Sequence, residues 1–592
     1  MIRVADYIFK YLADYGIKHV FLVTGGGSMF LNEALRKETR IKYVCNHHEQ
    51  ASAIAAEGYA RTSGKLAVVS VTSGPGGTNT LTGVLGQWAD SVPVLYISGQ
   101  VKFKTTLASA SNANLRQLGD QEINIIDIVK PITKYAKMIT DPKTIKEELK
   151  KAIFIATSGR PGPVWLDIPL DVQGALIDEN ALLTSDQIFW LKPNNNIYLV
   201  IDALKQAKRP LIIAGHGIRI AKAKQELLEL IELLHIPVVT TFNGFDLIQS
   251  NHNNFIGRIG TLGSRAGNFA LQNADLIICL GTRNNIRQVS YDWKNFAKNA
   301  KKIIIDIDSS ELKKPTIIGD IRINTDVKDF IEAFLENYHK NFIINLDWLW
   351  LLWCQDKKKK YPVILDEYRT QESINPYYFI EQLTTEANED AIIIAGNGTA
   401  CVTLFQAGIV KKNQRIFWNS GCAAMGYDLP AAIGAAFASN KSVICLAGDG
   451  SLQMNLQELQ TVKHHNLPIK LFVLNNSGYQ SIYQTQNNLF EGNLIGCTKE
   501  SGVSFPSIQK LAKAYDLKYC KINSTKRLNK NITKVLNYDG PVICEVILSN
   551  NYIFAPKLSS QKQEDGTMLS QPLENMFPFL SKEELKENMI NV

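Results

Sequence analysis

Short runs of apolar and β-branched residues alternate along the chain with longer stretches in which apolar residues recur every three or four positions. The short runs predict strands, and the periodic stretches predict amphipathic helices. Strands that alternate with helices are typical of parallel sheets covered by helices. The pattern therefore predicts an α/β protein of doubly wound parallel-sheet domains.

The alternation occurs in three successive blocks of four strand candidates each. These candidates are residues 19–23, 41–45, 67–72, 92–98, 210–214, 237–241, 276–280, 302–307, 391–395, 443–447, 469–474 and 542–548. A stretch with Pro and Gly over 160–174 and a polar link around Pro193 follow the first block. We expect three domains, over residues 1–180, 190–345 and 365–555.

Two segments fall outside the blocks. Residues 347–360 hold three tryptophans and then Lys357 to Lys360, a pattern that fits either a docked linker helix or a helix at a membrane surface. The tail over 556–592 mixes Gly, Ser, Gln and charged residues before a short helical pattern. It is expected to be either a lid over a site or an extension packed on the surface.

Composition narrows the class of protein. With 592 residues, 45% hydrophobic and 20% charged, the chain is neither a disulfide scaffold nor a disordered or collagen-like protein. Its formal net charge of +8 comes from scattered residues, which favours a small phosphorylated ligand over nucleic acid. The nine cysteines include no CxxC pair, and no secretory signal or membrane span is visible, so we expect a cytoplasmic protein with reduced thiols.

The strongest chemical signal lies at the ends of two neighbouring strand candidates. Gly448-Asp449-Gly450 follows the strand over 443–447, and 24 residues separate Gly450 from Asn475-Asn476, which follows the strand over 469–474. Ligands of open parallel sheets bind at the carboxyl ends of strands. Mg²⁺ prefers oxygen ligands and is often completed by phosphates. The pattern predicts a Mg²⁺ site formed by Asp449, Asn476 and a carbonyl of Gly478.

Glycine next to Asp449 allows main-chain N–H groups of Gly450 and Ser451 to approach a diphosphate. A helix is expected over 452–464, with its amino end at the same place. A Gly-Asp-Gly turn alone is a common end of a strand. Together with the spacing, the Asn pair and both strands, it resembles the cofactor motif of thiamin diphosphate (ThDP, thiamine pyrophosphate) enzymes, which implies that the chain binds ThDP with Mg²⁺.

Glu49 follows the strand over 41–45 and precedes a predicted helix over 51–61. Alone, it would be interpreted as an acidic residue at a helix start, stabilised by the helix dipole. ThDP enzymes need a carboxylic acid beside N1′ of the pyrimidine ring, and the resemblance implies that Glu49 has this catalytic role. A buried glutamate with a raised pKa would share a proton with that nitrogen.

The resemblance covers most of the chain, from Val4 to about Pro556. Residues 57–61, 72–79 and 98–100 look like the pyrimidine-binding domain of the acetolactate (acetohydroxyacid) synthase family. It implies a homodimer or homotetramer with active sites at the subunit interface. Residues 421–430 resemble the family segment whose methionine bends ThDP, here Met425, although core packing would explain that residue equally well. We also predict that Thr399 binds the cofactor.

The middle block resembles the flavin-binding domain of acetolactate synthases. Glycine turns and acidic residues after strands are suited to a dinucleotide, and the predicted FAD residues are Gly215, Gly217, Asp306 and Asp326. Many ThDP enzymes keep this domain without FAD, so both alternatives stay open. FAD would have a structural, non-redox role.

The donor expected from the family is pyruvate, and several residues bear on the identity of the acceptor. Gln121, Lys134 and Arg287 retain the acetolactate synthase pattern, and Gln121 is also predicted to be catalytic. The family tryptophan that narrows the acceptor site falls near Thr485, and a phenylalanine becomes Asp120. These polar positions would hydrogen-bond a polyhydroxylated acceptor.

The chain thus resembles a branch of the family that transfers an acetyl unit from pyruvate to a nucleotide-linked 4-keto-deoxysugar, as in yersiniose synthesis. Gly26, within a run of three glycines, supports that resemblance and is predicted to contact substrate. The alternatives are an acetolactate synthase, which condenses pyruvate with itself, and a catalytically silent regulatory subunit. The presence of Glu49, Asp449 and Asn476 argues against the silent subunit.

Overall fold

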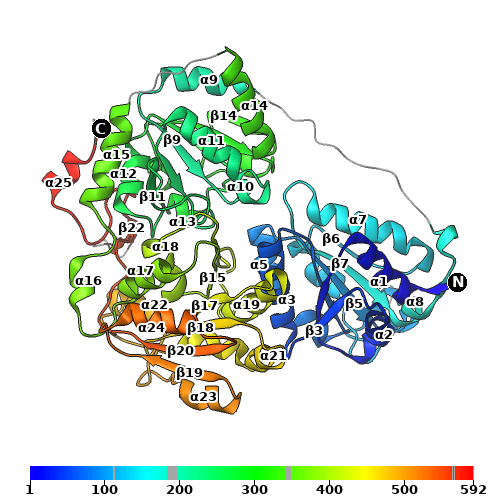
Figure 1. Ribbon diagram of the computed structural model, residues 1–592. Helices are drawn as coiled ribbons and strands as arrows, with labels where there is room; N and C mark the ends of the chain where they lie inside the picture. The colour runs from blue at the N-terminus through cyan, green and yellow to red at the C-terminus, as the bar shows by residue number, and fades with distance from the viewer. Residues whose placement is uncertain (111–113, 183–195, 342–347, 563–564, 566, 591–592) are drawn as a thin grey trace.

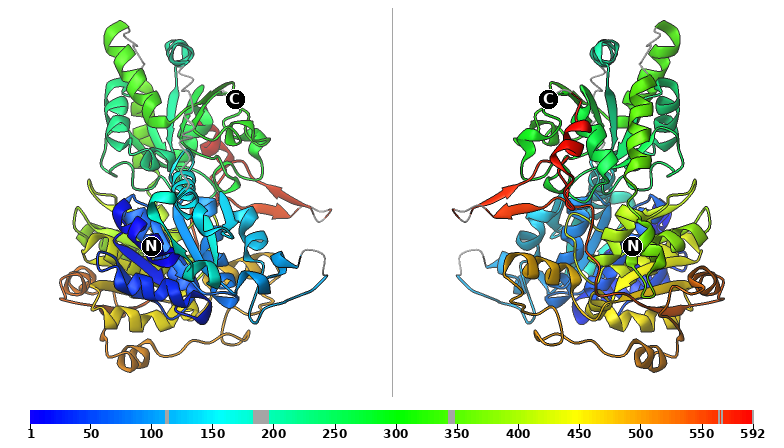
Figure 2. Two further views of the ribbon diagram at one scale, coloured as in Figure 1. Left: turned by 90° about the vertical axis from the view of Figure 1, so that its right-hand side faces the viewer. Right: turned by 90° about the vertical axis from the view of Figure 1, so that its left-hand side faces the viewer.

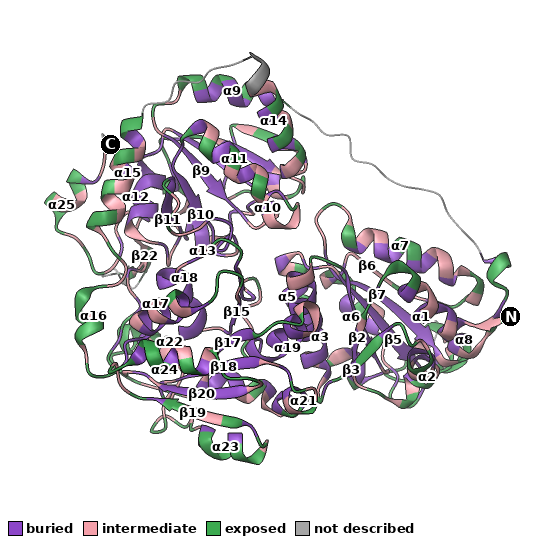
Figure 3. Cartoon of the chain, viewed as in Figure 1, coloured by how far each residue is buried: buried purple, intermediate pink, exposed green. Residues whose placement is uncertain are grey.

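The computed structural model describes residues 1–110, 114–182, 196–341, 348–562, 565 and 567–590, and these form three domains (Figure 1). Each domain is built on a parallel sheet of six strands. The strands are buried, and the exposed residues lie mainly on the covering helices and loops (Figure 3). The predicted fold class is confirmed. Among the described residues, none of the helices has the length and apolar character needed to cross a membrane.

The first and third domains share one strand order. Numbered along each domain, both sheets run 2-1-3-4-6-5. The first sheet contains β3 (Lys42–Cys45), β2 (His19–Leu22), β4 (Ala67–Val71), β5 (Val94–Gln100), β7 (Val164–Pro169) and β6 (Tyr135–Met138). The third contains β16 (Arg415–Phe417), β15 (Ile392–Ala395), β17 (Val443–Gly448), β18 (Ile469–Asn475), β20 (Val542–Ile547) and β19 (Lys518–Ile522).

The central domain has a different order, 3-2-1-4-5-6. Its strands are β11 (Phe255–Arg258), β10 (Val238–Thr240), β9 (Pro210–Ala214), β12 (Leu276–Leu280), β13 (Lys301–Asp306) and β14 (Ile321–Asn324). This is the order of dinucleotide-binding sheets, in which ligands bind where the order reverses. The reversal here lies between β9 and β12.

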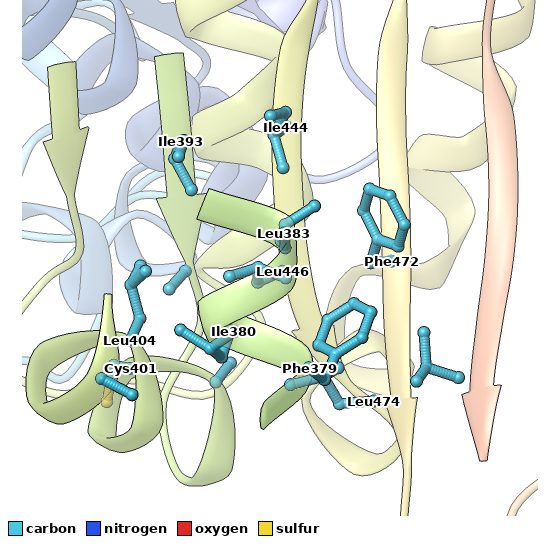
Figure 4. Close-up of a cluster of buried hydrophobic side chains, with 14 of the residues drawn as sticks. Phe379, Ile380, Leu383, Ile393, Cys401, Leu404, Ile444, Leu446, Phe472 and Leu474 are labelled. Atoms are coloured by element: carbon cyan, nitrogen blue, oxygen red, sulfur yellow. The ribbon is translucent and has the colours of Figure 1, made fainter. Parts of the chain in front are cut away.

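Helices cover both faces of these sheets. The main ones are α1 (Val4–Tyr15), α2 (Met29–Lys37), α3 (Glu49–Ser63), α5 (Leu81–Asp90), α7 (Ile145–Thr157), α11 (Lys224–Leu234), α12 (Arg265–Asn273), α14 (Val327–Asn341), α17 (Pro376–Glu386), α18 (Thr399–Ala407), α19 (Asp428–Ser439) and α22 (Gln480–Leu489). Figure 4 shows the core of the third domain, where apolar side chains of β15, β17 and β18 lie against α17 and α18. This packing holds the carboxyl ends of β17 and β18 in place.

The stretch over 160–174 was expected to follow the strands of the first block, but it contains β7. Every residue of this strand, Val164–Pro169, is buried, and β7 pairs with β5 and β6 inside the sheet. Its Pro and Gly flanks hid a strand that is too short to show periodicity. In addition, β1 (Ile2–Arg3) pairs antiparallel with β8 (Leu176–Ile177) at the end of the same domain.

The helix expected over 452–464 is broken into pieces. α20 (Asp449–Leu452) is followed by a 3-10 segment, Gln453–Glu458, and then by α21 (Leu459–His464). Asn455 departs from helical geometry, with φ −138° and ψ 34°. Its buried side chain donates to the carbonyl of Gly426 at 2.8 Å and to Gln50 Oε1 at 3.0 Å. These tertiary hydrogen bonds explain the break, because they hold Asn455 in a conformation that a continuous helix could not contain.

Two helices join the first domain to the third. α3 crosses α19 so closely that a Cβ atom on Gly58 would lie 2.1 Å from the carbonyl oxygen of Ala431, and one on Gly434 would lie 1.8 Å from that of Ala55. Side chains larger than hydrogen do not fit at this crossing. The crossing therefore fixes how α3, which begins at Glu49, meets the third domain.

The last residues run back over the central domain. α12 binds the tail through Arg265 and Asn268, which donate to the carbonyls of Met576 and Leu573. The β21–β22 hairpin (Ser560–Lys562 and Met568–Ser570) projects away from the body (Figure 2). The tail is thus packed on the surface in this chain, while a lid function over a site stays a prediction.

The linker segment is a helix, α15 (Trp348–Lys360), docked on the central domain. The Trp350 indole is buried and donates to the carbonyl of Pro210 at 2.9 Å, and Lys358 donates to the carbonyl of Phe255 at 2.7 Å. These contacts favour the docked linker over a membrane-surface helix. The expected link around Pro193 and the domain limits at 190 and 345 lie outside the described residues.

Candidate functional site

Asp449 and Asn476 meet at the carboxyl ends of β17 and β18, as their motif predicts. The two strands are parallel neighbours, with Gly448 opposite Leu474. The Asp449 carboxylate accepts hydrogen bonds from the main-chain N–H of Gly450 at 2.9 Å and of Asn476 at 3.2 Å. Burial raises the pKa of Asp449 to about 6, and the surrounding N–H groups oppose that rise. A buried carboxylate held by main-chain donors favours a cation as its further partner.

The Asn476 side chain is buried, and its amide nitrogen is hydrogen-bonded while its amide oxygen is not. Its Nδ2 donates to the hydroxyl of Tyr552 at 3.0 Å and lies 3.4 Å from Thr399 Oγ1. Among the described residues, Asn476 Oδ1 has no hydrogen-bond partner although it is buried. Buried polar atoms are almost always paired. An unpartnered amide oxygen on a residue whose main chain bonds to a buried carboxylate fits a Mg²⁺ ligand set.

Small residues line this site because its walls are close. A Cβ on Gly450 would lie 2.2 Å from the ring of Tyr479, and one on Gly478 would lie 2.4 Å from the carbonyl oxygen of Cys497. The Ser451 hydroxyl donates to Asp428 at 2.5 Å and accepts from the N–H of Gly426 at 2.9 Å. Ser451 thus ties the site to the loop that carries Met425.

Met425 lies on that loop with 39% of its surface exposed, which argues against plain core packing. Ala423 and Gly426 have φ angles of 57° and 79° on either side of it. The loop is held by Asn419 Oδ1, which accepts from the N–H of Cys422 and of Ala423 at 3.1 and 3.0 Å. An exposed methionine on a braced loop is suited to support a ligand.

Glu49 begins α3 in the first domain and is only 9% exposed. Its Oε2 accepts from Asn79 Nδ2 at 3.0 Å. Within the described part of the chain, no hydrogen bond joins Glu49 to the third domain. The neighbouring Asn46 and His47 do bond to the buried Glu458 of that domain, at 2.8 and 2.9 Å. Within one chain, therefore, no described hydrogen bond connects Glu49 with the domain that carries Asp449.

Sequence reasoning missed a buried charged cluster where all three domains meet. Asp90 accepts from Arg61 at 2.7 Å, from the N–H of Ser420 at 2.8 Å and from Asn243 at 3.1 Å. Glu57 pairs with the same Arg61 at 2.9 Å. The residues 57–61 were recognised only as a family segment. Because its members are far apart in sequence, no local pattern could have revealed the cluster.

Three of the four predicted flavin residues, Gly217, Asp306 and Asp326, line a cavity at the reversal of the central sheet. Its walls come from three domains and include Arg160, Gly217, Asp306, Asp326 and Ser420. This cavity has a volume of about 110 Å³, and a second cavity of about 660 Å³ shares Asp326 as a wall residue. Burial raises the pKa of Asp306 to about 6.

Gly215 has a packing role instead of a place on the cavity wall. A Cβ there would lie 2.2 Å from the carbonyl oxygen of Gly281, and one on Gly217 would lie 2.7 Å from the Cα of the same residue. The two glycine turns therefore pack directly on each other. This contact accounts for the glycines whether or not a dinucleotide binds.

The remaining predicted substrate residues come from different elements of the first two domains. Gly26 is exposed, and so is Gln121, which has a φ of 58°. Lys134 donates to main-chain carbonyls at the end of α7, those of Ile155 and Ser158, and burial lowers its pKa to about 8. Arg287 stacks over the ring of Phe242, 4.8 Å from its centroid. Their shared role at a substrate stays a prediction.

Thr485 is exposed on α22, as expected for a residue facing a ligand. Its hydroxyl donates to the carbonyl of Ser481 at 2.9 Å within the same helix. The adjacent Gln484 is buried and bonds to the main chain of Tyr552 and Phe554, at 3.0 and 3.2 Å. α22 is thereby attached to the segment that follows β20.

Comparisons with known proteins agree with the geometry of the site. The chain matches the N-terminal TPP binding domain of thiamine pyrophosphate enzymes over residues 2–126, the central domain over 197–334 and the C-terminal TPP binding domain over 396–546. It is 31% identical over 572 residues to the chloroplastic acetolactate synthase 3 of Brassica napus, which covers 94% of this chain and 85% of that protein.

Bacterial relatives are similar over nearly their whole length. The acetolactate synthase large subunit of Lactococcus lactis is 32% identical over 566 residues, 94% of each chain. The acetolactate synthase isozyme 1 large subunit of Escherichia coli is 30% identical over 548 residues, 92% of this chain and 93% of that one. The chain therefore belongs to the acetolactate synthase family of ThDP enzymes and is a ThDP-dependent carboligase.

Proposed function

We propose that the enzyme decarboxylates pyruvate and joins the two-carbon acetyl unit to a keto acceptor, with ThDP and Mg²⁺ bound at the carboxyl ends of β17 and β18. The observation that carries this proposal is the buried, unpartnered side-chain oxygen of Asn476, a residue whose main-chain N–H bonds to the Asp449 carboxylate. Both are the hard oxygen ligands that Mg²⁺ prefers. When bound, ThDP supplies the electron sink that decarboxylation of a 2-oxo acid requires.

The residues of the third domain would bind and orient the cofactor. Asp449, Asn476 and the carbonyl of Gly478 would hold Mg²⁺, while the N–H groups of Gly450 and Ser451 would contact the diphosphate. Met425 would support the cofactor from its braced loop, and Thr399 would contribute from the start of α18. The close walls around Gly450 would exclude water from the metal.

Glu49 would hold a proton beside the pyrimidine ring of the cofactor. The amide of Asn79 fixes one oxygen of its carboxyl group, which leaves the other for a ligand. We propose that this contact forms between subunits of a homodimer or homotetramer, because Glu49 makes no described hydrogen bond to its own third domain.

A Glu49→Gln variant tests this role. It should bind ThDP about as well as the wild type but lose most of its rate, at least a hundredfold, because an amide cannot shuttle the proton. Deuterium exchange at C2 of the bound cofactor, followed by NMR, measures the step without any acceptor. Exchange at the wild-type rate in Glu49→Gln would remove Glu49 from this role.

The first acceptor candidate is a second 2-oxo acid, which would make the enzyme an acetolactate synthase. The support is the similarity to acetolactate synthases over 94% of the chain. Arg287 would receive the carboxylate of that acceptor. The stacking of Arg287 on Phe242 leaves its N–H edges available for a planar, bidentate contact.

A nucleotide-linked 4-keto-deoxysugar is the second candidate. It is supported by exposed polar groups where the family pattern has bulky ones: Asp120 in the first domain and Thr485 on α22. Such groups would hydrogen-bond sugar hydroxyls. The resemblance to the yersiniose branch gives the same acceptor class.

Competition between the two acceptors decides the question. Purified enzyme is supplied with pyruvate, ThDP and Mg²⁺, with and without the keto sugar, while CO₂ and products are quantified by mass spectrometry. A sugar carrying two extra carbons supports the second candidate, and acetolactate in the presence of unreacted sugar supports the first. If no CO₂ forms from any simple 2-oxo acid, the silent-subunit alternative replaces both.

We also propose that the central cavity holds FAD in a non-redox role. Asp306 ends β13 and Asp326 follows β14, and both line the cavity, where their carboxylates would accept from ribose hydroxyls while Arg160 supplies a cation for phosphates. Arg160 already pairs with Asp308 and Glu311, at 3.0 and 2.7 Å, so phosphates would share it. Flavin released on denaturation of the purified enzyme, measured by fluorescence, tests this proposal.

A further inference from the structure

Tyr552 lies in the segment after β20 and is 4% exposed. Its hydroxyl is 2.6 Å from Thr399 Oγ1 and accepts from Asn476 Nδ2 at 3.0 Å. It thus connects the start of α18 to the end of β18. None of the motifs in the sequence points to this residue.

The position of Tyr552 is itself fixed by its neighbours. Gln484 donates to the Tyr552 carbonyl at 3.0 Å and accepts from the N–H of Phe554 at 3.2 Å. The rings of Tyr552 and Phe554 pack edge to face, with centroids 5.7 Å apart. The hydroxyl is therefore held rigidly against the asparagine.

An asparagine side chain can be a metal ligand in only one of its two orientations. Its oxygen accepts and its nitrogen donates, so the flipped amide would direct two N–H groups at the cation. Because Tyr552 and Thr399 take up the nitrogen end of Asn476, the oxygen end is the one left unpartnered. In this structure both hydroxyl oxygens accept from the nitrogen end, and the oxygen end is directed away from the hydroxyl pair.

We propose that Tyr552 is a positioning residue that fixes the Asn476 amide with its oxygen toward the Mg²⁺ site. The proposal rests on the metal site of the proposed function. Partners of this kind typically change metal affinity by about tenfold to a hundredfold when they are removed. Tyr552 also attaches the metal ligand to α22, the helix that carries Thr485.

The test compares wild type, Tyr552→Phe, Asn476→Asp and the double variant. Mg²⁺ affinity in saturating ThDP is measured by isothermal titration calorimetry. Tyr552→Phe should weaken Mg²⁺ binding by about tenfold or more. In the Asn476→Asp background, Tyr552→Phe should reduce the Mg²⁺ affinity much less. The two carboxylate oxygens are equivalent, so no orientation needs to be selected.

Tyr96→Phe serves as the matched control, since it removes another buried hydroxyl, bonded to Gln87 at 2.8 Å in the first domain. It should leave Mg²⁺ affinity unchanged. If circular dichroism shows that Tyr552→Phe does not fold, Thr399→Val, which removes the other hydroxyl, replaces it in the cycle. Equal losses in both backgrounds, or no loss in either, overturn the orientation role. A wild type that binds ThDP without Mg²⁺ overturns the metal site itself.

Discussion

His19 begins β2 with its ring packed between Tyr59 and Phe437, at centroid distances of 5.4 Å to each. Burial, with a smaller contribution from Lys42, lowers the pKa of His19 to about 4. An exposed histidine titrates near 6.5. The folded protein therefore resists protonation of a ring that the unfolded chain protonates readily.

This difference predicts a loss of stability in acid. Above about pH 6.5 neither state is protonated at His19, and its contribution is fully present; it is lost as the pH falls from about 6.5 toward 4. His19→Phe should reduce the fall in unfolding free energy over that range by about 1–3 kcal/mol. Urea unfolding at several pH values measures the effect, and parallel curves for the two proteins would contradict it.

At the metal site, the proposed ligands could be predicted from the sequence, but the residue that holds the Asn476 side chain in place could not. Asp449 and Asn476 each end a strand, and adjacent strands bring their ends together, so a local motif predicts their meeting. Tyr552 is 76 residues from Asn476 and lies in an irregular segment. Its role depends on tertiary packing, to which no periodicity corresponds.

Among the elements, the crossing of α3 and α19 is the most constrained. Gly434 faces the carbonyl of Ala55 with no room for a methyl group. Both helices are alanine-rich, which permits close approach but does not by itself indicate where they touch. The sequence predicts the two helices, while the crossing point follows only from the packing of two domains.

Gly434→Ala should therefore separate the helices. Overpacking of this kind costs about 1–3 kcal/mol or more, and we expect a lower unfolding midpoint. Gly26→Ala is a matched control, because no atom lies within 4 Å of the position of its added Cβ. Thermal unfolding followed by circular dichroism measures both variants, and an equal midpoint for the two would contradict the prediction.

Most strands are predictable from apolar runs, and the errors have physical causes. β7 was missed because its Pro and Gly flanks resemble a linker, although the strand is buried on both faces. The helix after Asp449 was predicted as continuous because Asn455 does not interrupt the apolar pattern. Its break depends on hydrogen bonds to Gly426 and Gln50, which come from elsewhere in the chain.

For the whole molecule, the lack of a described hydrogen bond between Glu49 and the third domain leads to a prediction about assembly. Chains carrying Glu49→Gln and chains carrying Asp449→Ala should each be nearly inactive. If each site takes Glu49 from one subunit and Asp449 from another, random mixing of the two variants in dimers restores about a quarter of the sites. Carboligation rates after co-refolding measure the recovery.

Each variant alone, refolded in the same way, is the control. A mixture that forms dimers by size-exclusion chromatography yet stays inactive would mean that both residues of a site come from one chain. Three domains, their sheets and the cofactor class followed from sequence patterns. How the domains of different subunits combine does not, because no residue pattern records which chain its partner belongs to.

The pairing of β1 with β8 brings the two ends of the first domain together, with Ile2 opposite Ile177. A domain whose ends are neighbours can be cut out, circularly permuted or inserted into a host loop without stretching its backbone. The chain should accordingly tolerate a circular permutation within its first domain, as long as α3 keeps its contact with α19. New ends could be opened at a surface loop while a short peptide joins Met1 to the residues after β8.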